Sequence, residues 1–86
     1  MIVKFYGNVA EQTGGEKTLE PGPCQDLGSL ICELGRRYGE SFGELLLSGE
    51  FCFFLVNGQG VMTTGGLDTP LKQGDRIEVL PLIEAG

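Results

Sequence analysis

The fold of this chain is decided near its end, by the stretch Lys72-Gln73-Gly74-Asp75-Arg76-Ile77-Glu78-Val79-Leu80-Pro81-Leu82. The stretch opens with a Gly-Asp turn, and its polar and apolar residues then alternate until Leu80 departs from the pattern. This period of two predicts a strand with Ile77 and Val79 on one face, which we expect to be the core face. Pro81 stiffens the exit of the chain from this strand and removes one backbone donor.

The last residues form a short tail after this strand. Leu82-Ile83-Glu84-Ala85-Gly86 carries one charged side chain and ends on a residue with none. A terminal glycine carboxylate is the least hindered acyl group that a chain can present, because no Cβ crowds the carbon under attack. The tail favours a protein whose own C-terminus is the reacting group, and a chance ending is the alternative. From Pro81 to Gly86 the chain can extend at most about 20 Å, enough to enter a partner's active site.

The N-terminal part begins with a predicted hairpin. Ile2–Tyr6 is rich in β-branched and aromatic residues, and Gly7 ends it. A turn at Gln12–Gly15 leads to a second expected strand at Glu16–Glu20. Pro21-Gly22-Pro23 terminates that strand. Two strands joined in this way are expected to pair as a hairpin.

A helix follows the hairpin. Asp26 is a suitable N-cap, and apolar residues then recur along one stripe as far as Tyr38. The stripe consists of Leu27, Leu30, Ile31, Leu34 and Tyr38. Gly39 is a natural C-terminal stop. We expect Ser41–Leu47 to add a short turn of helix.

A continuous apolar run of strand length, Phe51–Val56, comes next, and Asn57-Gly58 after it is a strong turn signal. A run that is apolar on both faces indicates a central strand, or a strand whose outer face a partner covers. Val61–Thr63 is expected to form a short edge strand, and Thr64–Pro70 a loop.

The expected order of elements is strand, strand, helix and three further strands. This order predicts an α+β protein of β-grasp architecture, with a mixed sheet of four to five strands and one main helix packed across one face. The first and last strands are expected to be neighbours in the sheet. Since 86 residues suffice for one hydrophobic core, we expect a single domain over residues 1–86 with a flexible C-terminal tail at 81–86.

The composition argues against several classes of function. The net charge is −6 and the six basic residues are scattered, which is unlike a nucleic-acid-binding protein and favours a basic partner. Neither a signal peptide nor an apolar run near 18 residues is found, so we expect no membrane association and a cytoplasmic location. Because the chain has three cysteines without CxxC spacing and no histidine, no metal site is expected.

Residues for catalysis are also missing from the sequence. Histidine, the usual general base, does not occur, and no P-loop pattern is found. Whether the chain counts as an enzyme is therefore left open. Cys24 lies beside Pro23 and is either a reactive thiol or an incidental cysteine, whereas Cys32 and Cys52 are expected to pack in the interior.

Two segments carry a resemblance to a known family. Val56-Asn57-Gly58 and Leu67–Pro81, with an Asp-Thr-Pro-Leu-Lys-x-Gly-Asp string before the last strand, resemble the ubiquitin-like sulfur carriers. The chain looks most like the small subunit of molybdopterin synthase, and the sulfur carriers of thiamine synthesis rank second. This chain ends Ala85-Gly86 where the family ordinarily ends Gly-Gly.

The resemblance implies a function for the tail. A ubiquitin-activating-like partner enzyme would use ATP to adenylate the Gly86 carboxylate, and sulfur would then displace AMP to leave a thiocarboxylate. The carrier would bind no cofactor and would deliver sulfur with the large subunit of molybdopterin synthase, in molybdenum or tungsten cofactor biosynthesis. The residues that would present the terminus are Pro81, Leu82, Ile83, Glu84 and Ala85. The alternatives are a sulfur carrier for thiamine or another sulfur metabolite, and a ubiquitin-like binding or protein-modifier domain.

Three apolar side chains are candidates for the surface that such a partner contacts. If Ile77 and Val79 point inward, Leu80 lies on the outer face, where exposed apolar groups commonly mark a partner site. Leu82 follows it along the chain, and Phe53 would join it from the neighbouring run. The alternative is a different strand register, in which these side chains belong to the core.

Overall fold

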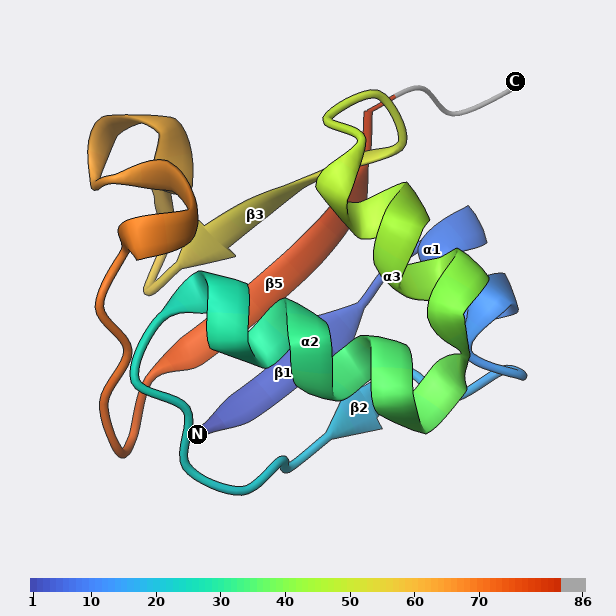
Figure 1. Cartoon of the computed structure of the whole chain (residues 1–86), viewed down its shortest axis with the longest axis horizontal. Helices are drawn as coiled ribbons and strands as arrows, with labels where there is room; N and C mark the ends of the chain where they lie inside the picture. Colours follow the sequence, from blue (N-terminus) through green and yellow to red (C-terminus); the bar gives the residue numbers. More distant parts are fainter. Residues whose placement is uncertain (83–86) are drawn as a thin grey trace.

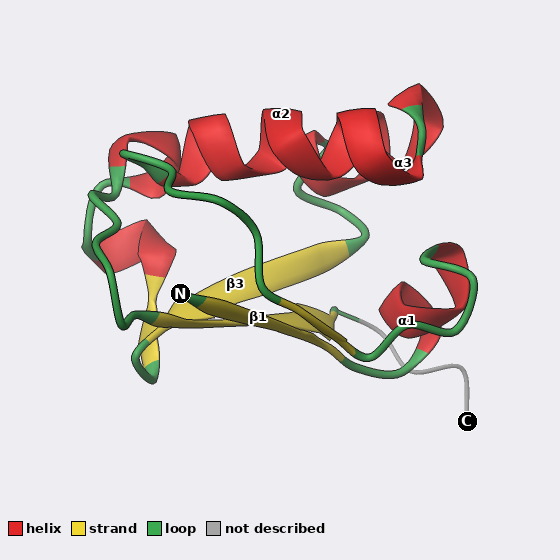
Figure 2. Cartoon of the chain, turned by 90° about the horizontal axis from the view of Figure 1, so that it is seen from below, coloured by secondary structure: helices red, strands yellow, loops and turns green. Residues whose placement is uncertain are grey.

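The chain forms a mixed sheet with its two longer helices on one face, as Figures 1 and 2 show. The computed structural model describes residues 1–82. The strands are β1 (Ile2–Phe5), β2 (Thr18–Leu19), β3 (Cys52–Val56), β4 (Gln59–Gly60) and β5 (Arg76–Pro81). The helices are α1 (Asn8–Gln12), α2 (Leu27–Tyr38) and α3 (Glu40–Leu47), with two 3₁₀ turns, η1 (Val61–Thr63) and η2 (Gly66–Asp68).

The last strand, β5, lies at the centre of the sheet. The strand order is β2-β1-β5-β3-β4, with β1 parallel to β5 and β3 antiparallel to it. The predicted pairing of the first and last strands is therefore confirmed. Val3 lies opposite Ile77, and Phe54 lies opposite Val79. All four side chains are buried, so this face of the sheet forms the floor of the core.

Helix α2 covers that floor, as the edge-on view of Figure 2 shows. Its N-cap is the predicted one: Asp26 Oδ1 accepts the Ser29 N–H at 2.8 Å, and this bond lowers the pKa of Asp26. Four residues of the predicted stripe are buried, namely Leu27, Leu30, Ile31 and Leu34. Gly39 ends the helix with φ 113°, a conformation that favours glycine. Helix α3 then begins at once.

Helices α2 and α3 approach each other closely where a glycine of one faces a glycine of the other. A Cβ added at Gly35 would lie 3.5 Å from the Cα of Gly43, an ordinary contact distance. A Cβ added at Gly43 would lie 3.3 Å from the Cα of Gly35, which is tighter than most such contacts. The site therefore has room for one methyl group and not for two.

We expect Gly35→Ala to raise the free energy of unfolding by up to about 1 kcal/mol, because alanine is the better helix former and its methyl group fits. The double variant Gly35→Ala/Gly43→Ala should instead be less stable than the single one, because the two methyl groups meet and force the helices apart. Urea unfolding followed by circular dichroism measures both. Additive gains from the two substitutions would contradict the close approach.

The segment after β4 does not form the predicted edge strand. Val61–Thr63 is a 3₁₀ turn, in which the Thr63 hydroxyl donates to the Gly60 carbonyl at 2.9 Å. The Thr64 N–H donates to the Val61 carbonyl at 3.0 Å. Local bonds of this kind compete with the ladder of a sheet. Val61 is also buried, so the turn fills the end of the core.

The N-terminal hairpin also differs from the prediction. A helix of five residues, α1, lies between β1 and β2 and buries Val9 and Ala10. Five residues are too few to show a periodic pattern, which is why the sequence does not predict this helix. The second strand is shortened from the expected Glu16–Glu20 to Thr18–Leu19.

A polar clamp joins the end of β3 to the start of β5. Asn57 has φ 52°, and its Nδ2 donates to Asp75 Oδ1 at 2.9 Å. Asn57 Oδ1 accepts the Arg76 N–H at 3.0 Å, and Asp75 Oδ2 accepts the Lys72 N–H at 2.8 Å. Asp75 is buried. The Asn-Gly and Gly-Asp turns of the sequence therefore form one structure, which holds the register between β3 and β5, and β5 is the strand that leads into the tail.

Candidate functional site

The chain leaves the sheet beside the start of β3. Pro81 is the last residue of β5 and lies opposite Cys52. The Leu82 N–H donates to the Phe51 carbonyl at 3.2 Å. The backbone is therefore held to the sheet as far as Leu82, past the predicted start of the tail at Pro81. The other predicted tail residues, Ile83, Glu84, Ala85 and Gly86, lie outside the described residues. Four residues beyond Leu82 can span at most about 14 Å.

The face of the sheet opposite the helices carries apolar side chains. Ile77 and Val79 are fully buried, so Leu80 projects from the other face. Leu80 lies opposite Phe53 in the β3–β5 register, and the Phe53 side chain is 39% exposed. Both residues thus lie on the outer face, and the alternative register that would place them in the core does not occur. Leu82 is also exposed. The role of the three in docking stays a prediction.

Tyr6 extends this surface from the side of β1. The residue before it pairs with Val79, so Tyr6 lies beside Leu80. The Tyr6 hydroxyl donates to Glu78 Oε2 at 3.0 Å, and this bond raises the pKa of Tyr6. Arg76 Nε lies 3.7 Å from Glu78 Oε1, so the apolar surface ends in a polar network. We refer to Tyr6, Phe53 and Leu80 as the outer patch. Tyr6 has the aromatic character of a docking residue, but the sequence alone does not show that it neighbours Leu80.

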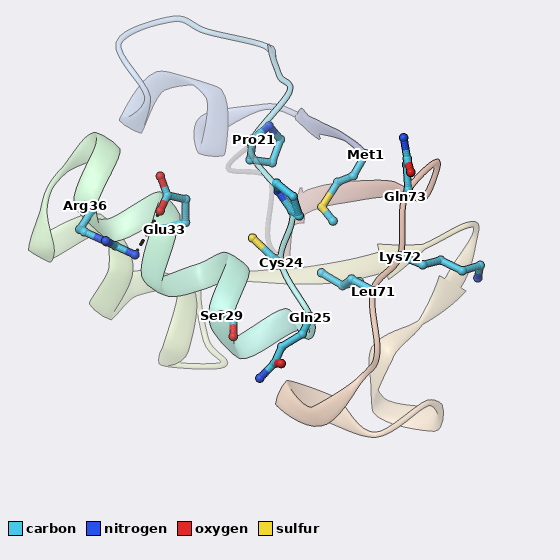
Figure 3. A pocket seen from close by; sticks show the side chains of 11 residues that line it. Met1, Pro21, Cys24, Gln25, Ser29, Glu33, Arg36, Leu71, Lys72 and Gln73 are labelled. Carbon is cyan, nitrogen blue, oxygen red and sulfur yellow. Dashed lines mark ion pairs between the residues drawn. The ribbon is translucent and has the colours of Figure 1, made fainter.

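A cavity of about 810 Å³ lies at the end of the sheet opposite the tail exit (Figure 3). It lies between α2 and the segment Leu71–Gln73, with Met1 and Cys24 on its wall. Because β1 and β5 are parallel, Met1 and the exit of the tail lie at opposite ends of these strands. Glu33 and Arg36 form an ion pair of 3.1 Å on its rim. The chain has no histidine that could activate the Cys24 thiol.

The three thiols differ in burial. Cys24 is partly buried with its Sγ 3.5 Å from the Gly22 carbonyl, and burial raises its pKa. The Cys24 thiol therefore stays protonated at neutral pH, which favours an incidental cysteine over a reactive one. Cys52 is buried as predicted, and burial raises its pKa to about 11. The prediction for Cys32 is wrong: this side chain is exposed, because the face of α2 that packs on the sheet is the one that carries Ile31 and Leu34.

Residues 1–82 contain no cluster of three or more His, Cys, Asp or Glu side chains that is placed to hold a metal ion. In the same part of the chain, no helix has the length and apolar character needed to cross a bilayer. What the described residues do provide is a tail exit at the end of β5 and, beside it, an outer patch made by β3, β5 and the residue after β1. This arrangement can present a chain terminus to a protein that docks beside it.

Comparison with known families assigns the chain to one of them. The sequence model of the ThiS family matches residues 3–86. The chain belongs to the ThiS family. The resemblance to ubiquitin-like sulfur carriers that the motifs indicated is thereby confirmed. No curated protein sequence matches the chain.

Solved structures show the same fold. CysO from Mycobacterium tuberculosis has a TM-score of 0.82 and 27% identity, covering 95% of this chain and 98% of that one. A chain in the BexX/CysO complex of Amycolatopsis orientalis has a TM-score of 0.81 and 26% identity, covering 99% and 98%. A chain in the complex of subunits 1 and 2 of molybdopterin-converting factor from Helicobacter pylori has a TM-score of 0.65 and 27% identity, covering 99% of this chain and 96% of that one. The predicted β-grasp architecture is confirmed.

Two of these three structures are complexes with another protein. They support a protein partner for this ThiS-family chain as well. The outer patch lies on β3 and β5 and directly after the end of β1, close to the exit of the tail at Leu82. A partner on this face would therefore also be within reach of the terminus.

Proposed function

We propose that this chain carries sulfur as a thiocarboxylate on Gly86 and donates it as the small subunit of a molybdopterin synthase. The observation that carries the proposal is the position of the tail exit, only two residues beyond Leu80 of the outer patch. A protein that docks on the patch would receive a tail with a reach of about 14 Å. Membership of a sulfur-carrier family supports the same chemistry.

The activation of the terminal carboxylate has to come from another protein. A carboxylate is a poor acyl donor, because its leaving group would be oxide. An adenylating enzyme of the ubiquitin-activating type would transfer AMP from ATP to the carboxylate and release pyrophosphate. A sulfur donor at the oxidation level of sulfide would then displace AMP, so that a C–S bond replaces a C–O bond without net oxidation. The carrier contributes the position of its terminus, which fits a chain without histidine.

A second candidate is the same thiocarboxylate with a different acceptor, in thiamine synthesis or the synthesis of another sulfur metabolite. The specific observation in its favour is that structural similarity does not single out the molybdopterin-converting factor. The TM-score is 0.82 with CysO and 0.65 with the chain from the molybdopterin-converting factor complex. The two candidates share the activation step and differ only in the protein that receives the sulfur.

Intact mass spectrometry tests the shared step. The chain is incubated with ATP, a sulfide donor and an adenylating enzyme of the ubiquitin-activating type, beside a relative that ends in Gly-Gly. We expect a gain of about 16 Da, the replacement of one oxygen by sulfur. If the relative reacts and this chain does not, the carrier function is wrong for this protein. Protein adducts linked through the terminus to lysine would instead indicate a modifier.

The acceptor is tested with the product of that reaction. The thiocarboxylated chain is mixed with a molybdopterin synthase large subunit and the pterin precursor. Loss of the added mass together with formation of the dithiolene product supports the first candidate. Retention of the added mass, when a cognate small subunit reacts under the same conditions, would favour the second.

The outer patch provides a binding prediction. Phe53→Ala should weaken binding to the synthase large subunit at least about 30-fold, because an exposed aromatic side chain at the centre of an interface commonly contributes about 2 kcal/mol or more. Ile2→Ala, on the same face at the other end of β1, is the matched control. Calorimetric titration measures both. Equal effects of the two substitutions would show that the outer patch is not the docking surface.

A further inference from the structure

A second apolar surface lies on the helix side of the sheet, at the edge of β3. It is a groove of about 410 Å³ between α3, the turns η1 and η2, and the first half of β3. Figure 1 shows α3 and the two turns on opposite sides of this strand. The groove rests on buried residues such as Leu46 and Phe54. Its walls are Leu47, Met62 and Leu67, which are 54%, 90% and 49% exposed. We refer to it as the β3 groove.

The groove exists because β4 is too short to cover β3. Strand β4 pairs with β3 only at Leu55 and Val56. The residues Cys52–Phe54 pair with β5 on one side and, among the described residues, have no strand on the other. An uncovered strand edge is usually protected by a charged side chain, a proline or a covering element. Here apolar side chains flank it, which is the pattern of an edge that receives a further segment.

The charge around the groove indicates which kind of segment it receives. Between residues 39 and 71 the chain has four acidic residues and neither lysine nor arginine. Two of the acidic residues, Glu50 and Asp68, directly follow the lining residues Gly49 and Leu67. A second copy of this chain would bring acidic groups against acidic groups, which opposes self-association. A segment that carries lysine or arginine beside its apolar side chains is complementary.

The tail leaves the sheet beside the groove. Leu82 lines the groove, and its N–H is bonded to the Phe51 carbonyl. The residue after Leu82 is the first of the four that lead to Gly86. A protein that encloses those four residues therefore lies within about 14 Å of the groove.

We propose that the β3 groove binds an extended apolar segment, flanked by lysine or arginine, of the enzyme that adenylates the tail. This inference rests on the proposed function, because it takes the adenylating enzyme as the partner. The groove and the outer patch lie on the two sides of the β3 edge and share Phe53. The groove thus gives the adenylating enzyme contacts that a protein docked only on the outer patch does not make.

The proposal is tested by the affinity of the full chain for the adenylating enzyme in the absence of ATP, so that binding is separated from chemistry. Met62→Glu changes a side chain that is 90% exposed, so folding should not suffer. We expect the dissociation constant of the Met62→Glu variant for the adenylating enzyme to rise about tenfold. In the complex the enzyme would bury the methionine side chain, and the variant would bury a charge in its place. Gln73→Glu, an equal charge change at the opposite end of the sheet, should stay within about twofold of the unchanged chain.

Charge reversal gives an independent measurement. Glu50→Lys and Asp68→Lys should slow association with the adenylating enzyme several-fold at low salt, and the difference should vanish at about 1 M salt, where the Debye length is about 3 Å. Glu20→Lys, an exposed site outside the segment that lines the groove, is the control. An equal effect at Glu20 would show a general effect of net charge and would overturn the proposal.

The outcomes separate the groove from the proposed function. If the chain gains about 16 Da and Met62→Glu binds as tightly as Gln73→Glu, the groove proposal is wrong and the carrier function stands. If the chain binds the enzyme through the groove without any mass gain, the carrier function is wrong and the groove proposal stands. A dimer of the unchanged chain that Met62→Glu dissociates, or no binding of the enzyme at all, would overturn the groove proposal.

Discussion

Deletion of Gly86 is expected to abolish thiocarboxylate formation. The deletion moves the terminal carboxylate back by up to about 3.5 Å and puts a methyl-bearing carbon next to it, since Ala85 becomes terminal. Misplacement of a reacting group by about 1 Å can already cost about 100-fold in rate. We therefore expect the mass gain to fall by more than about 100-fold, below detection. The fold should be unaffected, because the last strand of the sheet, β5, ends at Pro81.

A matched variant separates the length of the tail from its last residue. Deletion of Ala85 shortens the tail by the same amount but leaves a terminal glycine. If reach is decisive, both deletions should be inactive, because Leu82 is held to the sheet and cannot move forward without breaking its bond to Phe51. If only the deletion of Ala85 reacts, the terminal glycine itself is the requirement. A Gly86 deletion that gains mass as fast as the full chain would refute the terminal-carboxylate mechanism.

Loss of the Asp75 carboxylate is expected to be the most damaging of the polar substitutions considered. Asp75→Ala removes the acceptor of the Asn57 Nδ2 bond at 2.9 Å and of the Lys72 N–H bond at 2.8 Å. Because Asp75 is buried, its truncation leaves a gap in the clamp and two donors without their acceptor. We expect the free energy of unfolding to fall by about 2–4 kcal/mol. Chemical denaturation measures this loss, and Asp75→Asn, which keeps one acceptor oxygen, should lose less.

The pH dependence of stability provides a second readout for Asp75. The hydrogen bond from Asn57, followed by the Lys72 amide and the Lys72 charge, lowers the pKa of Asp75. A carboxyl with a lowered folded-state pKa stabilises the fold above its unfolded value of about 3.9. That contribution disappears as the pH falls through the folded-state pKa. Below about pH 4 the unchanged chain should therefore lose stability faster than Asp75→Ala. Parallel curves would show that the carboxylate is not coupled to the fold.

A double-mutant cycle tests whether the clamp acts as a unit. Asn57→Gly keeps a residue that tolerates φ 52° but removes both side-chain bonds. The double variant Asn57→Gly/Asp75→Ala should lose less stability than the sum of the two single losses, with a coupling of about 0.5–3 kcal/mol. Additive losses would mean that the two turns are held independently.

The elements that could be predicted were those with a long or regular pattern. The stripe from Leu27 to Leu34 places four buried residues on one face of α2, and the alternation at Ile77 and Val79 places both on the core face of β5. The first pattern repeats over about two turns of helix, and the second covers the part of β5 from Arg76 to Val79. In both elements, burial of the apolar face outweighs the preference of single residues for another secondary structure.

The elements that could not be predicted were short or set by neighbours. Val61–Thr63 has the composition of a strand, but two threonines and the burial of Val61 turn it into η1. Cys32 is apolar enough for a core, yet its place on α2 turns it to solvent. For the candidate site, the sequence pointed to Leu80 and Phe53, but their pairing and the presence of Tyr6 beside them follow from the sheet register.

The sequence by itself determined the class of the protein and the strand from which the tail leaves. These depend on local periodicity and on turn residues, both of which are properties of neighbouring residues. Only the tertiary structure decided that the sheet holds the chain as far as Leu82 and that the first half of β3 remains uncovered. Both depend on which strands pair and for how many residues, and that is decided by contacts between segments far apart in the chain.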